Sequence, residues 1–216
     1  VSRLVKLRAM SARELRVRAA YAAFCTMERA ELRRARAAHP LRLRRLLRRD
    51  LRRSTDWQRL LLARRSEAVR RFFPSVSEPD AIRQAFGSTY RTHRTASLAR
   101  AEDVLHHRIA FFGETFEFGS PIPWNTDPVK GTEWPRVYHR DVPTHASAAY
   151  GDVKYVWELN RHQFLVDVAK AWFLTGEHRS VAKMSELVES WIADNPYGVG
   201  VSWACALEPA FRTFSW

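Results

Sequence analysis

The sequence is poor in cysteine and has no long apolar run. Its two cysteines, Cys25 and Cys205, lie far apart without metal-type spacing, so we predict neither a disulfide framework nor a zinc site. No apolar run approaches the roughly 18 residues of a membrane span. The first residues also do not show the apolar stretch and small-residue cleavage site of a secretory signal. We predict no transmembrane segment, no metal and no cofactor.

Motifs of known catalytic machinery are equally scarce. The tripeptide at 139–141, "HRD", matches a kinase motif, but no Gly-rich loop, strand lysine or Asp-Phe-Gly accompanies it. His106 and His107 are adjacent on an expected helix, so their side chains diverge, and no third ligand is spaced to join them. We therefore interpret both features as coincidences.

The positive charge is confined to the first half of the chain. Residues 1–100 hold 26 Lys and Arg against 8 Asp and Glu, whereas residues 101–216 hold 10 against 15. The arginines stand among Leu and Ala, which favours helices with a hydrated basic face. An anionic polymer, a membrane surface or a nucleic acid would be the alternative partner of this face.

The N-terminal half predicts Arg-rich helices. A first helix is expected over 11–38, with Ser11 as N-cap and Glu14 closing a capping box. A second basic helical stretch is expected over 41–73 and a third, short helix over 79–107.

The segment 111–150 predicts irregular structure, because five prolines and three glycines interrupt it. Phe116 and Phe118 alternate with polar residues, so a short strand or hairpin is possible. Long loops that carry aromatics such as Trp124, Trp134 and Tyr138 are often functional. The alternative is that these aromatics only pin the loop onto a helical body.

The last third predicts an antiparallel helical hairpin. Asp152 can cap a helix to about Leu174, Thr175 and Gly176 can form the turn, and a second helix is expected over 178–195. A final helix, capped by Ser202, would reach residue 216. This final helix shows no stop signal, so we expect the protein to continue beyond residue 216.

A polar group interrupts the first helix of this hairpin, in "GDVKYVWELNRHQF" at 151–164. Trp157, Asn160, Arg161 and Phe164 would share one helical face. An indole can stack on a pyranose ring, an amide hydrogen-bonds its hydroxyls, and a guanidinium pairs with a carboxylate or sulfate.

Buried ion pairs between helices are the alternative explanation of the same residues. Arg161 could pair with Glu208, or Glu158 with Arg212, since buried charges are nearly always partnered.

Several stretches resemble a known family. "DVKYVWELNRHQFLVDVAKAWFLTGEHR", followed by "WIADNPYGVGVSWACALEPAFRTFSW", resembles the N-terminal helical domain of heparinase II/III-type polysaccharide lyases, a group that includes alginate lyases. The upstream stretch 111–135 is similar to the segment before that motif and carries a W-x-x-D-P element at 124–128. The start at residue 10, "MSARELRVRAA", resembles starts of bacterial members. The resemblance is strong over 110–216 and weak before residue 100.

The resemblance implies a partial (α/α) toroid of helical hairpins, normally followed by a β-sandwich domain. It implies β-elimination on uronate-containing polysaccharides, in which an Asn or His neutralises the carboxylate, a Tyr or His removes the C5 proton and an acid protonates the leaving oxygen. In the family these catalytic groups lie in later helices, so the resemblance places them beyond residue 216. No catalytic residue is therefore carried over.

The resemblance also suggests residues that bind substrate. The proposed substrate-binding residues are Trp157, Glu158, Asn160, Arg161, Ser202, Trp203 and Trp124. Glu208 and Arg212 match an E-x-x-x-R element and are expected in structural ion pairs. Ser202 replaces the usual Asn, and Pro209 is unusual inside a helix.

These observations combine into one expectation. We predict an all-α fold with three regions: a basic helical region at 1–107, an irregular segment at 108–150 and helical hairpins at 151–216. The expected partner is an anionic polysaccharide, without specific nucleic-acid binding, and the resemblance implies a periplasmic or secreted location. The alternative function is a non-catalytic helical module that binds anionic glycan, lipid or nucleic acid through its Arg-rich half.

Overall fold

The computed structural model describes residues 10–36 and 78–216 of the chain. The chain divides into two compact units, 1–62 and 63–216. The described part of the first unit is helix α2 (Ala12–Arg36). The N–H of Glu14 donates to Oγ of Ser11 at 3.2 Å, which confirms the predicted N-cap. The predicted basic stretch 41–73 lies entirely outside the described residues.

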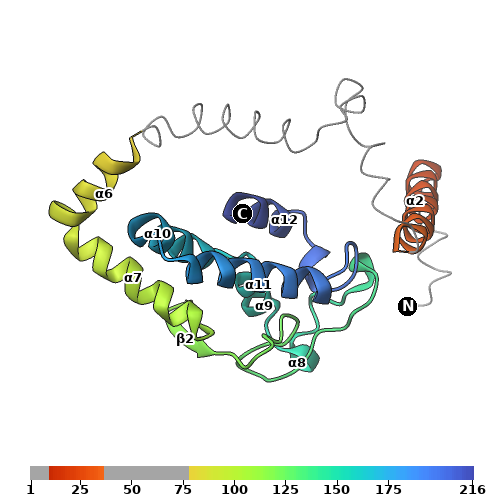
Figure 1. Cartoon of the computed structure of the whole chain (residues 1–216). Helices are drawn as coiled ribbons and strands as arrows, with labels where there is room; N and C mark the ends of the chain where they lie inside the picture. Colours follow the sequence, from red (N-terminus) through yellow and green to blue (C-terminus); the bar gives the residue numbers. More distant parts are fainter. Residues whose placement is uncertain (1–9, 37–77) are drawn as a thin grey trace. The chain divides into compact units, whose positions relative to one another are not determined.

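The described part of the second unit is mostly helical, as predicted, with one small hairpin (Figure 1). Its elements are α6 (Pro79–Ser88), α7 (Arg91–Leu105), β1 (Arg108–Phe111), β2 (Glu114–Glu117), η3 (His139–Asp141), α8 (Ser147–Tyr150), α9 (Val153–Asn160), α10 (Leu165–Thr175), α11 (His178–Asp194), η4 (Val201–Trp203) and α12 (Leu207–Ser215). Helix α10 packs against both α7 and α11. No helix among the described residues combines the length and apolar character that crossing a membrane requires.

The prediction of one helix over 79–107 was wrong, because this stretch forms two separate helices. Helix α6 starts at Pro79, whose fixed φ suits a first helical position. It ends where the N–H of Tyr90 donates to the carbonyl oxygen of Ala85 at 2.9 Å, five residues back. Helix α7 then runs to Leu105.

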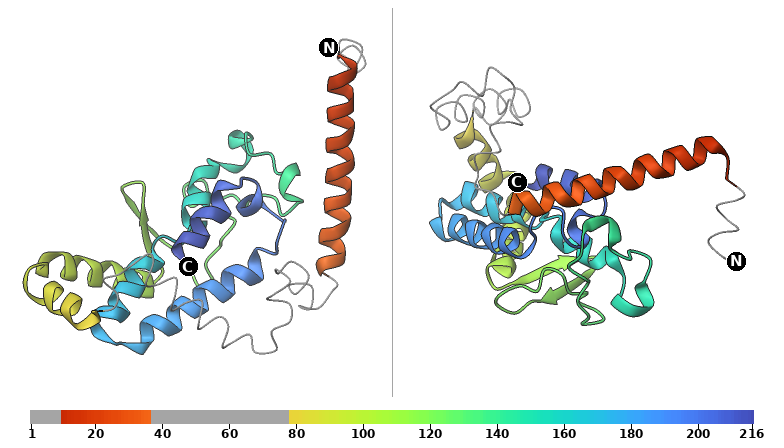
Figure 2. Two further views of the ribbon diagram at one scale, coloured as in Figure 1. Left: turned by 90° about the horizontal axis from the view of Figure 1, so that it is seen from above. Right: turned by 90° about the vertical axis from the view of Figure 1, so that its right-hand side faces the viewer.

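The suspected hairpin is confirmed and starts at Arg108. Arg108 pairs with Glu117 and Phe111 with Glu114, so two residues form the turn. Both have positive φ, Phe112 at 53° and Gly113 at 81°, the signature of a turn whose twist matches that of the strands. The hairpin follows directly on α7, and its two strands lie side by side (Figure 2).

The helix predicted from Asp152 to Leu174 is broken in its middle. Asp152 does cap α9, because its Oδ1 accepts the N–H of Lys154 at 3.0 Å. The helix ends at Asn160, however, and His162 has a positive φ of 58°. The ring of His162 packs against Trp124 and Trp191, each with centroids 5.3 Å apart. Packing against distant segments thus accompanies the break.

The α10–α11 hairpin is confirmed, whereas the start of the last helix was predicted wrongly. Gly176 forms the turn with a φ of 74°. Ser202 lies in η4, and α12 starts at Leu207 after Ala206. Pro209 therefore lies in the first turn of α12, where no intrahelical N–H bond is required, and its position is ordinary.

Residues from all three predicted regions share one hydrophobic core. The largest buried cluster comprises Val104, Ile109, Ile122, Trp124, Leu159, Leu165, Val168, Leu187 and Trp191. A second cluster comprises Trp134, Val142, Val153, Val156 and Val201. The aromatic segment 108–150 therefore contributes side chains to both clusters. Val153 at the start of α9 packs in the second cluster, and Leu159 near its end packs in the first.

We expect Gly151→Ala to destabilise the second unit strongly. Gly151 has a φ of 91°, and a Cβ there would lie 2.0 Å from Oδ2 of Asp127. Asp127 is buried, and its Oδ1 accepts the N–H groups of Val129 and Lys130, so it cannot move aside freely. The free energy of unfolding in urea should fall by about 2–4 kcal/mol.

The matched control is Gly87→Ala, in the last turn of α6, where an added Cβ meets no atom within 4 Å. This variant should keep or raise the free energy of unfolding, by up to about 1 kcal/mol. Equal losses in both variants would contradict the steric explanation.

Candidate functional site

The structure brings the predicted site residues together in one polar–aromatic cluster. The cluster is formed by Trp124 of the aromatic segment, the end of α9, the link from α9 to α10, and by α11, η4 and α12. The cluster comprises Trp124, Trp157, Glu158, Asn160, Arg161, His162, Trp191, Ser202, Trp203, Glu208, Arg212 and Trp216. Its members span 93 positions of sequence, from 124 to 216. Tertiary packing, rather than one helical face, therefore assembles it.

Asn160 lies at the centre of the cluster and is 0% exposed. Its Nδ2 donates to the carbonyl oxygens of Trp124 at 2.7 Å and Val156 at 2.6 Å. Its Oδ1 accepts from Nε1 of Trp191. The amide thus ties α9 to the aromatic segment and to α11, and its hydrogen bonds go to protein groups.

The predicted indoles also donate to the protein. Nε1 of Trp157 donates to the carbonyl oxygen of Val201 at 3.0 Å, and Nε1 of Trp124 donates to Oγ of Ser190 at 3.1 Å. Trp124 is buried and Trp157 is half-buried. Phe164 follows the break after α9, so it does not extend the face that carries Trp157.

Arg161 lies between two carboxylates. Its Nε and Nη2 donate to the two oxygens of Glu208, both at 2.9 Å, and its Nη1 donates to Glu158. The hydrogen bonds that Arg161 donates to Glu208 are the main cause that raises the pKa of Arg161. Glu208 is 1% exposed, and the guanidinium also lies 4.6 Å from the ring centre of Phe211. Glu158 pairs with Arg161 rather than with its alternative partner Arg212.

Arg212 is a buried cation, 3% exposed. It donates to the carbonyl oxygens of Ser202 at 2.7 Å and Asn160 at 3.4 Å. Its guanidinium lies 4.6 Å from the ring centre of Trp191 and 5.0 Å from that of Trp203. Burial lowers the pKa of Arg212 to about 10, against the raising effect of the Glu208 charge. Arg212 therefore keeps its charge at neutral pH.

His162 was not among the predicted site residues. Nε1 of Trp216 donates to its Nδ1 at 2.9 Å, so the neutral ring carries its proton on Nε2. Burial, helped by the charge of Arg212, lowers the pKa of His162 to about 3. Within the described part of the chain, Nε2 of His162 and Oγ of Ser202 have no hydrogen-bond partner. The signal for His162 was its place beside Asn160 and Arg161 in an apolar segment.

Four rings form a continuous aromatic row on this cluster. Ring centroids are 4.9 Å apart between Tyr197 and Trp203, 5.8 Å between Trp203 and Trp191, and 5.7 Å between Trp191 and Trp216. The ends of the row are exposed, Tyr197 at 67% and Trp216 at 57%. Trp203 is half-buried. Exposed rings of this kind can stack on the apolar face of a sugar.

The predicted substrate contacts thus fall into two groups. Three of the seven are buried, namely Asn160, Trp124 and Ser202, whereas four keep part of their surface exposed, namely Trp157, Glu158, Arg161 and Trp203. Sequence reasoning missed Tyr197 and Trp216 as candidate contacts, although aromatic residues after a Pro and at a helix end were visible signals. The role of the seven predicted residues in substrate binding stays a prediction. Among the described residues, no group of three or more His, Cys, Asp or Glu could hold a metal ion.

One comparison with known proteins gave a match. The family model described as "Heparinase II/III N-terminus" matches residues 49–216, which is more than half of the chain. The match includes α6 to α12 and thereby the whole polar–aromatic cluster. The comparisons with curated proteins and with solved structures gave no match.

We expect Glu208→Gln to destabilise the fold through its two arginine neighbours. The substitution keeps the shape of the side chain but removes the negative charge that faces Arg161 and Arg212. A buried ion pair that loses one partner leaves an uncompensated charge, so the free energy of unfolding should fall by about 3 kcal/mol or more.

The matched control is Asp80→Asn, which removes the exposed ion pair of Asp80 with Arg83. Denaturant unfolding of this variant should show a change below about 1 kcal/mol. A similar loss in both variants would show that burial of Glu208 has no special importance.

Stability should depend on pH through His162. Its folded pKa of about 3 lies below the ordinary value of 6.5, so only the unfolded chain binds this proton between those pH values. The stabilisation is therefore complete above pH 6.5 and is lost as the pH falls towards 3, by up to about 1.4 kcal/mol per pH unit.

The measurement is the slope of the unfolding free energy between pH 6.5 and 5, in the natural chain and in His162→Gln. This slope gives the number of protons that the chain takes up on unfolding. That number should be smaller by about one in the variant, whatever its absolute stability. The exposed His178→Gln is the control and should keep the natural slope. An unchanged slope in His162→Gln would refute the assignment.

Proposed function

We propose that this chain, which belongs to the heparinase II/III family through its N-terminal domain, is the substrate-binding part of a polysaccharide lyase that acts by β-elimination. Its substrates would be uronate-containing anionic polysaccharides. In this proposal the hairpin of α10 and α11 forms part of an (α/α) toroid. The family match over residues 49–216 is the observation that carries the proposal.

The aromatic row supports a role in binding a chain of sugars. Tyr197, Trp203 and Trp216 offer exposed or half-buried rings, and the buried ring of Trp191 connects Trp203 with Trp216. Stacking on successive sugar rings needs such a series, and it tolerates variation in sugar substituents. Arg161 and its partner Glu158 retain some exposed surface and could meet a carboxylate or a hydroxyl of the bound sugar chain.

The buried members of the cluster would act by positioning. Asn160 fixes the end of α9 against Trp191, and Arg212 lies beneath Trp191 and Trp203. They would hold the rings of the row in one orientation, which lowers the entropic cost of binding a flexible polymer. Substrate binding by Asn160 itself would require its present hydrogen bonds to be exchanged.

The chemical step needs a group that neutralises the uronate carboxylate, a base for the C5 proton and an acid for the leaving oxygen. We assign none of these roles to a residue of 1–216 and propose that they lie beyond residue 216. The ionisable side chains of the cluster support this assignment. Arg161, Glu158 and Glu208 are held in ion pairs, and His162 is buried and neutral.

The engagement of these ionisable side chains within the protein also favours a second candidate, a non-catalytic module that binds anionic glycan. The two candidates share the aromatic row and differ in the presence of lyase chemistry. The basic charge of residues 1–100 would add a contribution to binding that falls with salt, and equal binding of glycan and DNA would indicate charge alone.

The test uses the protein with any continuation that its gene encodes, incubated with heparan sulfate and with alginate. A lyase should generate unsaturated uronyl ends, which absorb in the ultraviolet. Tyr197→Ala should raise KM or Kd by about two- to tenfold, because one stacking ring is lost. Trp172→Ala, an exposed tryptophan of α10 outside the row, should leave both unchanged.

Each result decides between the candidates. Glycan binding without unsaturated product would favour the non-catalytic module. Absence of both product and binding, or equal effects of Tyr197→Ala and Trp172→Ala, would refute the proposed role of the aromatic row.

A further inference from the structure

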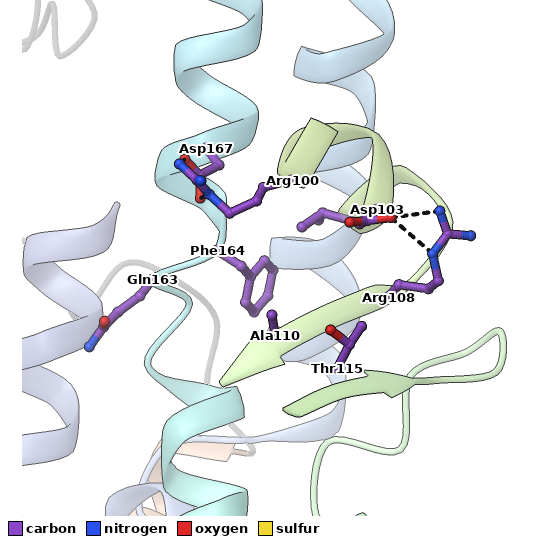
Figure 3. A pocket seen from close by; sticks show the side chains of 9 residues that line it. Arg100, Asp103, Arg108, Ala110, Thr115, Gln163, Phe164 and Asp167 are labelled. Carbon is purple, nitrogen blue, oxygen red and sulfur yellow. Dashed lines mark hydrogen bonds and ion pairs between the residues drawn. The ribbon is translucent and has the colours of Figure 1, made fainter. Parts of the chain in front are cut away.

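A hollow lies between α7, the β1–β2 hairpin and the start of α10. It has a volume of about 240 Å³. Side chains that line it include Arg100 and Asp103 of α7, Arg108 and Thr115 of the hairpin, Phe164 and Asp167. The hollow depends on the break after α9, because a continuous helix would not deliver Phe164 to this place (Figure 3).

The four charged side chains of the hollow form two ion pairs. Nε and Nη2 of Arg100 donate to the two carboxylate oxygens of Asp167 at 2.9 and 3.0 Å. Nε and Nη2 of Arg108 donate to Oδ1 of Asp103 at 3.0 and 2.7 Å. The charges of the four lining side chains therefore balance, and the ammonium of Lys170 lies 3.7 Å from Oδ1 of Asp167.

Both pairs keep hydrogen-bonding capacity that the described residues do not use. No bond is found in the described part of the chain to Nη1 of Arg100, Nη1 of Arg108 or Oδ2 of Asp103. The hydroxyl of Thr115 is likewise without a described protein partner, and Thr115 is exposed. Each ion pair thus places an available donor close to acceptor oxygens that can take a further bond.

An aromatic ring completes the hollow. Figure 3 shows the ring of Phe164 between the side chains of α7 and those of Ala110 and Thr115. The ring is held from behind by His162, with centroids 5.7 Å apart. Phe164 is half-buried, so part of its surface remains accessible. The hollow consequently joins an apolar surface to a rim of paired donors and acceptors.

We infer that this hollow binds one neutral, hydroxyl-rich ring, a hexopyranose or a cyclic polyol, as a site separate from the aromatic row. Vicinal hydroxyls each donate and accept, which matches a guanidinium beside a carboxylate, and the C–H face of the ring matches Phe164. The volume is below the roughly 300–1,000 Å³ of sites for larger ligands, so it accommodates a single ring. This inference goes beyond the proposed function and does not depend on it.

The experiment titrates the full chain with D-glucose, D-mannose, D-galactose and myo-inositol, and with D-glucuronate as the charged comparison. Binding is followed by ligand-observed NMR and by calorimetry. At least one neutral probe should bind with a Kd in the millimolar range, as weak as single-ring ligands with few hydrogen bonds commonly are. D-glucuronate should bind no more tightly than D-glucose, because both guanidiniums of the hollow are already paired with its two carboxylates.

Two variants locate the binding. Thr115→Val removes one hydroxyl from an exposed strand position without a change of volume, and Asp103→Asn removes the charge of one carboxylate. Each should weaken binding of the neutral probe by about two- to tenfold. Two controls outside the hollow, Thr95→Val and Asp80→Asn, should leave the Kd unchanged. Thermal unfolding of Thr115→Val should match that of the natural chain, so its loss of binding would not reflect unfolding.

Three outcomes would overturn the inference. They are the absence of binding by every neutral probe, equal affinity in Thr115→Val and the natural chain, and tighter binding of D-glucuronate than of D-glucose. A variant of the aromatic row, Tyr197→Ala, should keep the Kd for the neutral probe. Failure of this site therefore remains distinguishable from failure of the proposed lyase function.

Discussion

The buried amide of Asn160 is the constraint on which the rest of the second unit depends. It connects α9 with the carbonyl oxygen of Trp124 and the indole of Trp191. A buried amide without partners would cost several kcal/mol, so the three segments are fixed relative to one another once it is satisfied. The end of α9, the position of the aromatic segment and the rotation of α11 all follow from this one set of bonds.

The charges around Asn160 can be buried only because they compensate one another. Glu208 faces Arg161 through two hydrogen bonds, and Arg212 lies close enough to gain from the same carboxylate. The rings of Trp191 and Trp203 lie against the guanidinium of Arg212 and add cation–π attraction. Such networks are costly to break and rigid when complete. This rigidity gives the exposed rings above them a defined orientation.

Two kinds of surface result, and they suit different ligands. The aromatic row combines two exposed rings, Tyr197 and Trp216, with the half-buried Trp203 and the buried Trp191. Its accessible rings lie at several places, which suits a polymer. The hollow around Phe164 is small and electrically balanced, which suits a single neutral ring. Both surfaces depend on the helix break at His162. The break ends α9 at Asn160, next to Trp191 of the row, and it brings Phe164 to the hairpin.

The sequence by itself determined the local features. Ser11 and Asp152 cap their helices and Gly176 ends one, because each of these signals acts within a few residues. The family was also recognisable from motifs alone. Only the tertiary structure decided that the helix breaks at His162 and that Asn160 is buried among protein hydrogen-bond partners. Burial and hydrogen-bond partners come from segments far apart in sequence, and helical periodicity carries no information about them.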